Sequence, residues 1–134
     1  MRYMLDTNIC IYAIKRSPPE VVRRLEALTQ GSAVMSVVTY AELRAGMALN
    51  TTQCARDQQV LGLLTTYIPV LPFDEAAAER FGVLRAAVRE RNRDTMDRLI
   101  AAHAVSLSLT LVTNNEADFK GYPGLVVENW TLSA

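Results

Sequence analysis

One stretch near the start constrains the fold of this chain more than any other: residues 4–8, with the sequence MLDTN. Two apolar residues lead into Asp6, and an apolar segment over residues 9–14 follows Thr7. This order predicts a short buried strand that stops at Asp6 and a helix that starts beside it, with Thr7 as a candidate cap. Ligands of open α/β sheets bind outside the carboxyl ends of the strands. The sequence therefore places Asp6 where such folds carry their chemistry.

Strand and helix patterns alternate along the rest of the chain. Short apolar strands are predicted at residues 3–5, 33–36, 68–72, 110–113 and 125–127. Helices are predicted at residues 7–15, 19–28, 37–49, 56–67, 75–91 and 96–107. The third strand contains two prolines and is expected at an edge of the sheet. The alternation predicts an α/β fold: a single domain over residues 1–134, with a central parallel β-sheet of about four or five short strands flanked by helices.

Composition adds few constraints. The chain has 14 basic and 14 acidic residues, so its charge gives no indication of nucleic-acid binding. Two cysteines, Cys10 and Cys54, make no disulfide framework and fit a reducing compartment. No apolar stretch approaches the roughly 20 residues of a membrane span, and no signal-peptide core precedes the first acid. A cytoplasmic protein without a membrane segment is expected.

Acidic side chains from distant parts of the chain are predicted to meet at one edge of the sheet. Glu42 lies in the first turns of the helix after the second strand, at the same edge as Asp6. Asp97 begins the helix that leads into the fourth strand. This helix must run antiparallel to that strand, so its start lies where the strand ends. Asn115 and Asp118 follow the fourth strand and reach the same edge.

Carboxylates crowded together repel one another unless a cation lies between them. Oxygen ligands of this kind suit Mg²⁺ or Mn²⁺, and such a metal supports hydrolysis of a phosphodiester bond. Each acid also fits a structural role when taken alone. Glu42 completes a capping box with Thr39, and Asp97 favours the dipole of its helix. Convergence on one edge is what favours the metal-site interpretation.

Four blocks of the sequence resemble the signature blocks of PIN-domain ribonucleases. They are MLDTN at residues 4–8, SVVTYAEL at 36–43, DRLIAAHA at 97–104 and LVTNN at 111–115. Their order and spacing match, and the resemblance is strongest to VapC-type toxins of bacterial toxin–antitoxin pairs. The ending over residues 118–130 is also similar to that group. The resemblance covers nearly the whole chain.

The resemblance implies an endoribonuclease that depends on Mg²⁺, with Mn²⁺ as the alternative. Asp6, Glu42 and Asp97 fall on the acidic metal-site positions of the family. The fourth acid of the family is replaced here by Asn115, which we still assign to the catalytic set. Asp118, three residues further on, is expected to supply the missing charge.

Supporting roles follow from the same resemblance. Thr7, Asn8 and Thr113 fall where family members orient metal-bound waters. Residues 92–96 depart from the pattern, because similar toxins usually carry a glycine-containing loop there. Arg93 is expected to contact the RNA backbone, as is Arg98, since both lie near the acid that opens the sixth helix.

The resemblance also implies partners. Similar toxins form homodimers and are silenced by a small antitoxin whose C-terminal segment fills the active-site groove. Related toxins cut structured RNA, often a transfer RNA near its anticodon, and single-stranded loops are the accessible targets in such RNA. Apolar faces at residues 34–38 and 60–64 suit either a dimer or an antitoxin helix, and the sequence leaves both uses open.

Other functions compete with this interpretation. A phosphatase with an aspartyl nucleophile needs a second aspartate two residues later, where this chain has Asn8. A phospho-acceptor domain would use Asp57, but the chain lacks the paired acids and the late lysine of such domains. A catalytically weak, RNA-binding PIN domain is the third alternative, because of Asn115. The lone histidine, His103, is expected in the core or an interface rather than on a metal, whose other ligands are oxygens.

Overall fold

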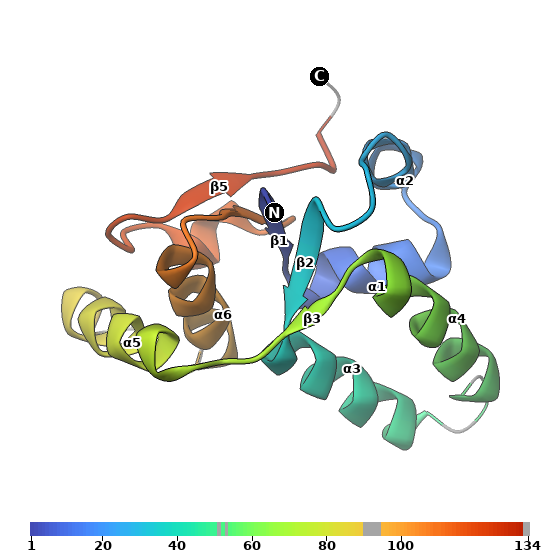
Figure 1. Cartoon of the computed structure of the whole chain (residues 1–134), viewed down its shortest axis with the longest axis horizontal. Helices are drawn as coiled ribbons and strands as arrows, with labels where there is room; N and C mark the ends of the chain where they lie inside the picture. The colour runs from blue at the N-terminus through green and yellow to red at the C-terminus, as the bar shows by residue number, and fades with distance from the viewer. Residues whose placement is uncertain (51, 53, 90–94, 133–134) are drawn as a thin grey trace.

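The computed structural model of the protein describes residues 1–50, 52, 54–89 and 95–132. Strands and helices alternate along it (Figure 1). The strands are β1 (Tyr3–Leu5), β2 (Ala33–Ser36), β3 (Val70–Leu71), β4 (Thr110–Val112) and β5 (Val126–Glu128). The helices are α1 (Thr7–Lys15), α2 (Pro19–Glu26), α3 (Val37–Leu49), α4 (Cys54–Tyr67), α5 (Glu75–Ala87), α6 (Thr95–Ser106) and the 3₁₀ helix η1 (Glu116–Phe119).

The strands form one parallel sheet of five in the order β3-β2-β1-β4-β5, counted over the described residues. The chain moves outward from β1 to β2 and β3, then returns to place β4 and β5 on the other side of β1. The strand order therefore reverses between β1 and β4. This reversal is the switch point at which open α/β sheets bind their ligands.

Strands β1, β2, β3 and β4 each contribute side chains to two hydrophobic cores, because successive residues point to opposite faces. Tyr3 and Leu5 pack with α1, α2, α3 and α4, whereas Met4 packs with α5 and α6. Figure 1 shows the two helix layers on either side of the sheet. All three β1 residues are buried. The central strand is thus covered on both faces, and only its ends are available for a site.

The α/β fold with a central parallel sheet is confirmed, and β3 is an edge strand as its prolines indicated. Two predicted helix caps are wrong. Asp6 rather than Thr7 caps α1, and Ser36 rather than Thr39 caps α3. In both cases the cap is the residue at the strand end, because its extended backbone lets the side chain accept from the first turn.

Several predicted boundaries also shift. Helix α4 begins at Cys54, two residues before the prediction, and α5 ends at Ala87, four residues before it. The predicted polar break at residues 92–95 lies mostly outside the described residues. Over the described part of the chain, no helix is both long and apolar enough to cross a membrane.

Candidate active site at the carboxyl edge of the sheet

Asp6 lies at the switch point, where β1 ends and α1 begins. Its Oδ1 accepts a hydrogen bond from the backbone N–H of Ile9 at 2.9 Å, and the residue is 5% exposed. Burial raises the pKa of the Asp6 carboxyl above its ordinary value, and the charge of Glu42 raises it further. Hydrogen bonds, chiefly from the Thr113 side chain and the Ile9 backbone, oppose this rise. Such a carboxyl gains most from a nearby cation.

Thr7 joins the first turn of α1 to α3. Its hydroxyl donates to Glu42 Oε1 at 2.5 Å and lies 3.4 Å from the hydroxyl of Thr39. A hydroxyl has one hydrogen, so when Thr7 donates to Glu42, the contact with Thr39 is a hydrogen bond only if Thr39 donates to Thr7. Thr39 is fully buried. The Glu42 carboxylate is therefore held by the Thr7 hydroxyl, which contacts Thr39 in turn.

Thr113 connects the end of β4 to Asp6. Its Oγ1 accepts from the backbone N–H of Asn115 at 3.0 Å, and its side chain is hydrogen-bonded to Asp6. The Asn115 side chain instead donates to Asp118 Oδ2 at 2.6 Å. Asn115 is exposed and Asp118 is half-buried. Thus the Asn115 side chain pairs with Asp118, while the backbone of Asn115 bonds to Thr113 beside Asp6.

Asn8 takes part in a separate polar chain beside these carboxylates. Its amide donates to Asn114 Oδ1 at 3.3 Å, and the Asn114 amide donates to the Tyr12 hydroxyl at 3.0 Å. Asn8 is exposed. Its side chain is therefore held at the surface of the site rather than inside it.

Asp97 lies in the first turn of α6, in the helix layer on the other face of the sheet from α1 and α3. Asp97 lies about 14 Å along α6 from Ser106, the last residue of that helix. The chain then returns along β4, whose end lies about 10 Å from its start. The backbone of Asp97 is thus near the level of the strand end. However, no group of three or more His, Cys, Asp or Glu side chains among the described residues is arranged to hold a metal. The structure brings Asp6 and Glu42 together, and a metal site that also includes Asp97 stays a prediction.

The donor set at this edge fits a hard divalent cation. Asp6 and Glu42 supply carboxylate oxygens, and Thr7 and Thr113 supply hydroxyls that orient them. Mg²⁺ is commonly bound through one or two carboxylates and keeps several waters. A pair of carboxylates with oriented oxygens is therefore sufficient chemistry for such an ion.

The prediction that Arg98 contacts RNA at the protein surface is wrong. Arg98 is 1% exposed, and its Nε donates to the Tyr122 hydroxyl at 3.3 Å. Its guanidinium also approaches the backbone carbonyl of Val88 at 3.5 Å. The Arg98 side chain is therefore buried in the core. Arg93 lies outside the described residues.

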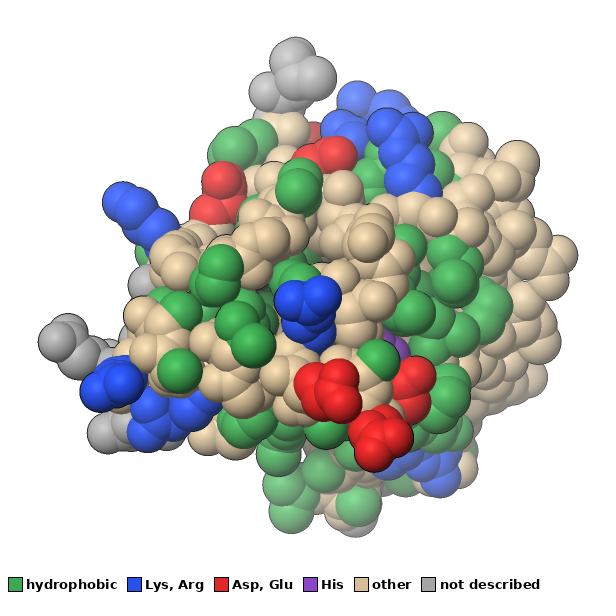
Figure 2. All heavy atoms as spheres, turned by 60° about the vertical axis from the view of Figure 1, so that its left-hand side comes forward, with side chains coloured by type: hydrophobic (Ala, Val, Ile, Leu, Met, Phe, Trp, Pro, Cys, Tyr) green, Lys and Arg blue, Asp and Glu red, His purple; other side chains and the backbone are tan. Residues whose placement is uncertain are grey.

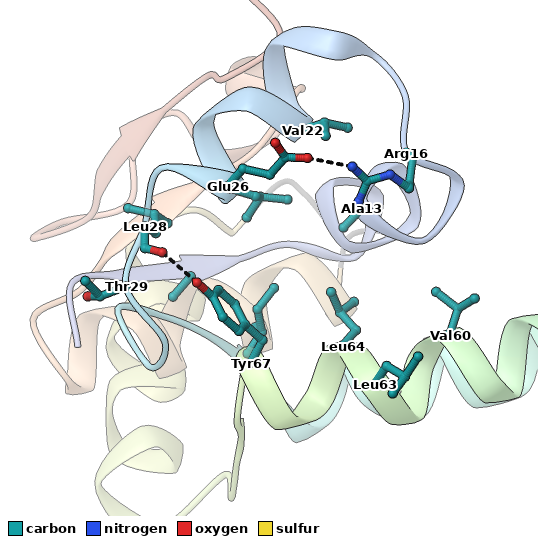
Figure 3. A pocket seen from close by; sticks show the side chains of 13 residues that line it. Ala13, Arg16, Val22, Glu26, Leu28, Thr29, Val60, Leu63, Leu64 and Tyr67 are labelled. Atoms are coloured by element: carbon teal, nitrogen blue, oxygen red, sulfur yellow. Dashed lines mark hydrogen bonds and ion pairs between the residues drawn. The ribbon is translucent and has the colours of Figure 1, made fainter.

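An apolar groove of about 440 Å³ opens at the other end of α1 from the carboxylates (Figure 3). It lies between α1, α2 and α4, and Leu63 on its wall is 68% exposed. The rim carries an ion pair between Arg16 and Glu26 at 2.5 Å, and Tyr67 donates to the Leu28 carbonyl at 2.9 Å. Part of the predicted apolar face at residues 60–64 lines this groove, whereas Val34 is buried in the core.

Sequence reasoning missed two side chains that shape the site. Thr39 stands three residues before Glu42, so the helical period already placed both on one side of α3. Asn114 had no comparable signal. Its contacts are with residues 102 and 106 positions away in the sequence, a pairing that only the tertiary fold creates.

The family model described as the PIN domain matches residues 3–125. The chain is 39% identical over 133 residues to the tRNA(fMet)-specific endonuclease VapC of Shigella flexneri, covering 98% of this chain and 99% of that protein. It is 35% identical to Ribonuclease VapC2 of Rickettsia felis, covering 97% and 98%. The crystal structure of VapBC2 from Rickettsia felis bound to a promoter DNA fragment superposes with a TM-score of 0.85 at 34% identity, covering 97% of this chain and 99% of that one.

Proposed function

The chain belongs to the PIN-domain family and to its VapC-type ribonucleases, and on that premise we propose that it is a metal-dependent endoribonuclease acting as the toxin of a toxin–antitoxin pair. The observation that carries the proposal is the pair of Asp6 and Glu42 at the β1/β4 switch point. We take residues 1–134 as one nuclease domain that works in the cytoplasm, where its RNA substrate is found.

PIN-domain nucleases use divalent metal ions, and we propose Mg²⁺ here, with Mn²⁺ as a substitute. Asp6, Glu42 and Asp97 would hold the ion. When bound, the ion supplies an activated water and stabilises the charge on the departing oxygen. The chain itself supplies orientation: Thr7 fixes the Glu42 carboxylate, and Thr113 fixes that of Asp6.

The outer residues of the edge serve the substrate side of the site. Asn8 and Asn115 are exposed, and each carries an amide that can bind sugar or phosphate oxygens. We propose that Asp118 contributes through Asn115, to which it is hydrogen-bonded, in place of the fourth acid of the family. The proposed substrate is a transfer RNA, which the name tRNA(fMet)-specific endonuclease of a VapC relative supports. We propose that the cut lies near the anticodon.

The test is cleavage of a transfer-RNA pool by the purified protein, with and without Mg²⁺, and with mapping of new 5′ ends. We expect a defined cut that disappears on chelation and in Asp6→Asn. Asp57→Asn is the matched control, because Asp57 lies in the first turn of α4 rather than at a strand end. Cleavage that survives chelation would overturn the mechanism. A specific RNA complex without any cleavage would favour the weak, RNA-binding alternative.

We propose a cognate antitoxin as the protein partner, with the groove between α1, α2 and α4 as its contact surface. Solved relatives that are VapBC or toxin–antitoxin complexes support the existence of such a partner. The groove starts near Ala13, about 10 Å along α1 from Asp6, so an extended partner could cover groove and site together. Leu63→Asp should weaken co-purification with the antitoxin, whereas Leu49→Asp should not. Both leucines are exposed, at 68% and 88%, so neither change should unfold the protein. If the antitoxin captured the two variants equally well, the groove would be excluded as its contact surface.

We also propose that the chain acts as a homodimer. Apolar side chains reach the surface on α3, α5 and α6, with Val37 39%, Val83 50% and Met96 51% exposed. Figure 2, turned so that the α5 side of the molecule comes forward, shows hydrophobic side chains between separate acidic and basic groups. Sedimentation of the purified protein tests this, and Val83→Asp should shift it toward the monomer.

A further inference from the structure

A buried hydrogen bond joins the two helices that carry site acids. His103 Nδ1 lies 2.7 Å from Ser36 Oγ, and the two residues are 1% and 0% exposed. Ser36 ends β2 and caps α3, where its Oγ accepts from the backbone N–H of Val38 at 3.1 Å. His103 lies in the middle of α6. The bond therefore ties the start of α3 to the body of α6.

The direction of this bond follows from its surroundings. His103 is also hydrogen-bonded to the backbone of Pro72, and a proline backbone can only accept. Burial lowers the pKa of the His103 imidazole, while the charge of Asp74 and the Pro72 contact oppose that fall. A neutral imidazole has one N–H, which Pro72 takes. Nδ1 is then an acceptor, and Ser36 donates to it while receiving the Val38 N–H.

The Ser36–His103 hydrogen bond lies at the same distance along α3 from Glu42 as it lies along α6 from Asp97. Glu42 is six residues after Ser36 on α3, and Asp97 is six residues before His103 on α6. Each separation is about 9 Å of helix. The Phe73 ring packs edge-on against the imidazole, with centroids 5.5 Å apart at 76°. The imidazole is thus fixed on three sides, and a misplacement of about 1 Å at a reacting group can cost about a hundredfold in rate.

We propose that His103 is a positioning residue, which through Ser36 fixes Glu42 on α3 relative to Asp97 on α6. The proposal rests on the proposed function for the identity of these carboxylates as metal ligands. It differs from a purely structural role for His103, in which the imidazole would stabilise the core without influencing the metal site.

Two variants separate these roles. His103→Asn places an amide oxygen near the position of Nδ1 and keeps an acceptor for Ser36. His103→Gln reaches instead toward Pro72 and loses the Ser36 bond. Both remove the ring from Phe73, so their effects on packing are matched. Circular dichroism and thermal melts define a temperature at which both variants are folded.

The readout is the dissociation constant for Mn²⁺ alone, measured from the free-ion signal by electron paramagnetic resonance. We expect His103→Asn to bind like the wild type and His103→Gln to bind about tenfold more weakly, the scale typical of groups that orient metal ligands. Equal constants for the two variants would overturn the positioning role. A wild type that binds no Mn²⁺ would overturn the proposed function as well. Mn²⁺ binding without RNA cleavage would count against the proposed function alone.

A second measurement needs no variant of His103. The chain contains one histidine, so the imidazole ¹⁵N signals belong to His103 alone. We expect an unprotonated Nδ1 at neutral pH and a shift of its signal when Mg²⁺ is added. The shift should persist in Asp57→Asn and disappear in Asp6→Asn. A protonated Nδ1, or a signal that saturating Mg²⁺ leaves unchanged, would overturn the proposal.

Discussion

The carboxyl edge of the sheet has two halves that are built differently. The inner half consists of Asp6, Thr7, Thr39, Glu42 and Thr113. The outer half consists of Asn8, Asn114, Asn115 and Asp118. Three inner residues are buried and the other two are half-buried, whereas each outer residue is half-buried or exposed. The inner hydrogen bonds join three elements, α1, α3 and the end of β4. In the outer half, the exposed Asn8–Asn114 bond also joins distant segments, whereas Asn115 and Asp118 are three positions apart.

This difference separates what is fixed before a ligand arrives from what can adjust to it. A buried hydrogen bond between elements is maintained by the packing of both, and its loss leaves a polar group without water. An exposed pair competes with solvent and contributes little. The inner half is therefore suited to hold a metal ion in one geometry, and the outer half to accommodate a flexible RNA strand.

The strongest test of the inner half is Asp6→Asn. The change removes the charge but keeps an oxygen that can cap α1, so the fold should be retained. We expect the cleavage rate to fall about a thousandfold, since a metal ligand contributes several kcal/mol to the transition state. Single-turnover cleavage with Mg²⁺ measures this. A fall of less than tenfold would remove Asp6 from the metal site.

Thr7→Val tests whether orientation within the inner half matters. The variant keeps the size of the side chain and loses the hydroxyl that donates to Glu42. We expect the Mg²⁺ concentration for half-maximal activity to rise about tenfold, as for other groups that orient metal ligands. Thr7→Ser is the control and should behave like the wild type. If Thr7→Val and Thr7→Ser needed the same Mg²⁺ concentration for half-maximal activity, Glu42 would not depend on a hydroxyl donor at position 7.

The raised pKa of Asp6 can be tested by measuring how the thermal stability of the protein depends on pH. Burial raises this pKa in the folded protein, so the folded state binds a proton more tightly than the unfolded state does. Ionisation of Asp6 should then destabilise the metal-free protein as pH rises above the ordinary carboxyl range. At pH 7 in chelator, Asp6→Asn should melt at a higher temperature than the wild type.

The same comparison at acidic pH supplies the control. Below the ordinary carboxyl pKa, Asp6 is neutral in both states, and the difference in melting temperature should disappear. A wild type more stable than Asp6→Asn at pH 7 without metal would mean that the hydrogen bonds around Asp6 outweigh its desolvation.

The smallest effect is expected in the outer half. Asp118→Asn removes a half-buried charge that accepts from Asn115 near the surface. We expect cleavage to change by less than about fivefold, corresponding to the roughly 1 kcal/mol of an exposed interaction. A loss comparable to that of Asp6→Asn would mean that Asp118 is a full replacement for the fourth acid, and the division into halves would fail.

Much of this arrangement was accessible from the sequence. Strand β1, helix α1, strand β2 and helix α3 have the predicted bounds, because each is short, strongly patterned and ended by a polar residue. The acids at strand ends were found for the same reason. The caps were not. Two polar residues stand near each helix start, and only the backbone angles decide which of them accepts from the first turn.

Arg98 shows where the sequence has no information. A basic residue one position after a site acid reads as exposed, yet a helix turns by about 100° per residue. That turn takes Arg98 from the edge into the core, where Tyr122 and the Val88 carbonyl accept its hydrogen bonds. The predicted set of three carboxylates relies on helices in two different layers of the fold, and secondary structure does not set the distance between layers. That set therefore stays a prediction.

The sequence by itself determined the parallel sheet and the residues that end its strands, since apolar periodicity and strand ends are local properties of the chain. Only the tertiary structure decided which of those residues touch. It joined Thr7 to Glu42, set His103 against Ser36 and directed Arg98 inward. Such contacts depend on how layers pack, and packing is a property of the whole chain at once.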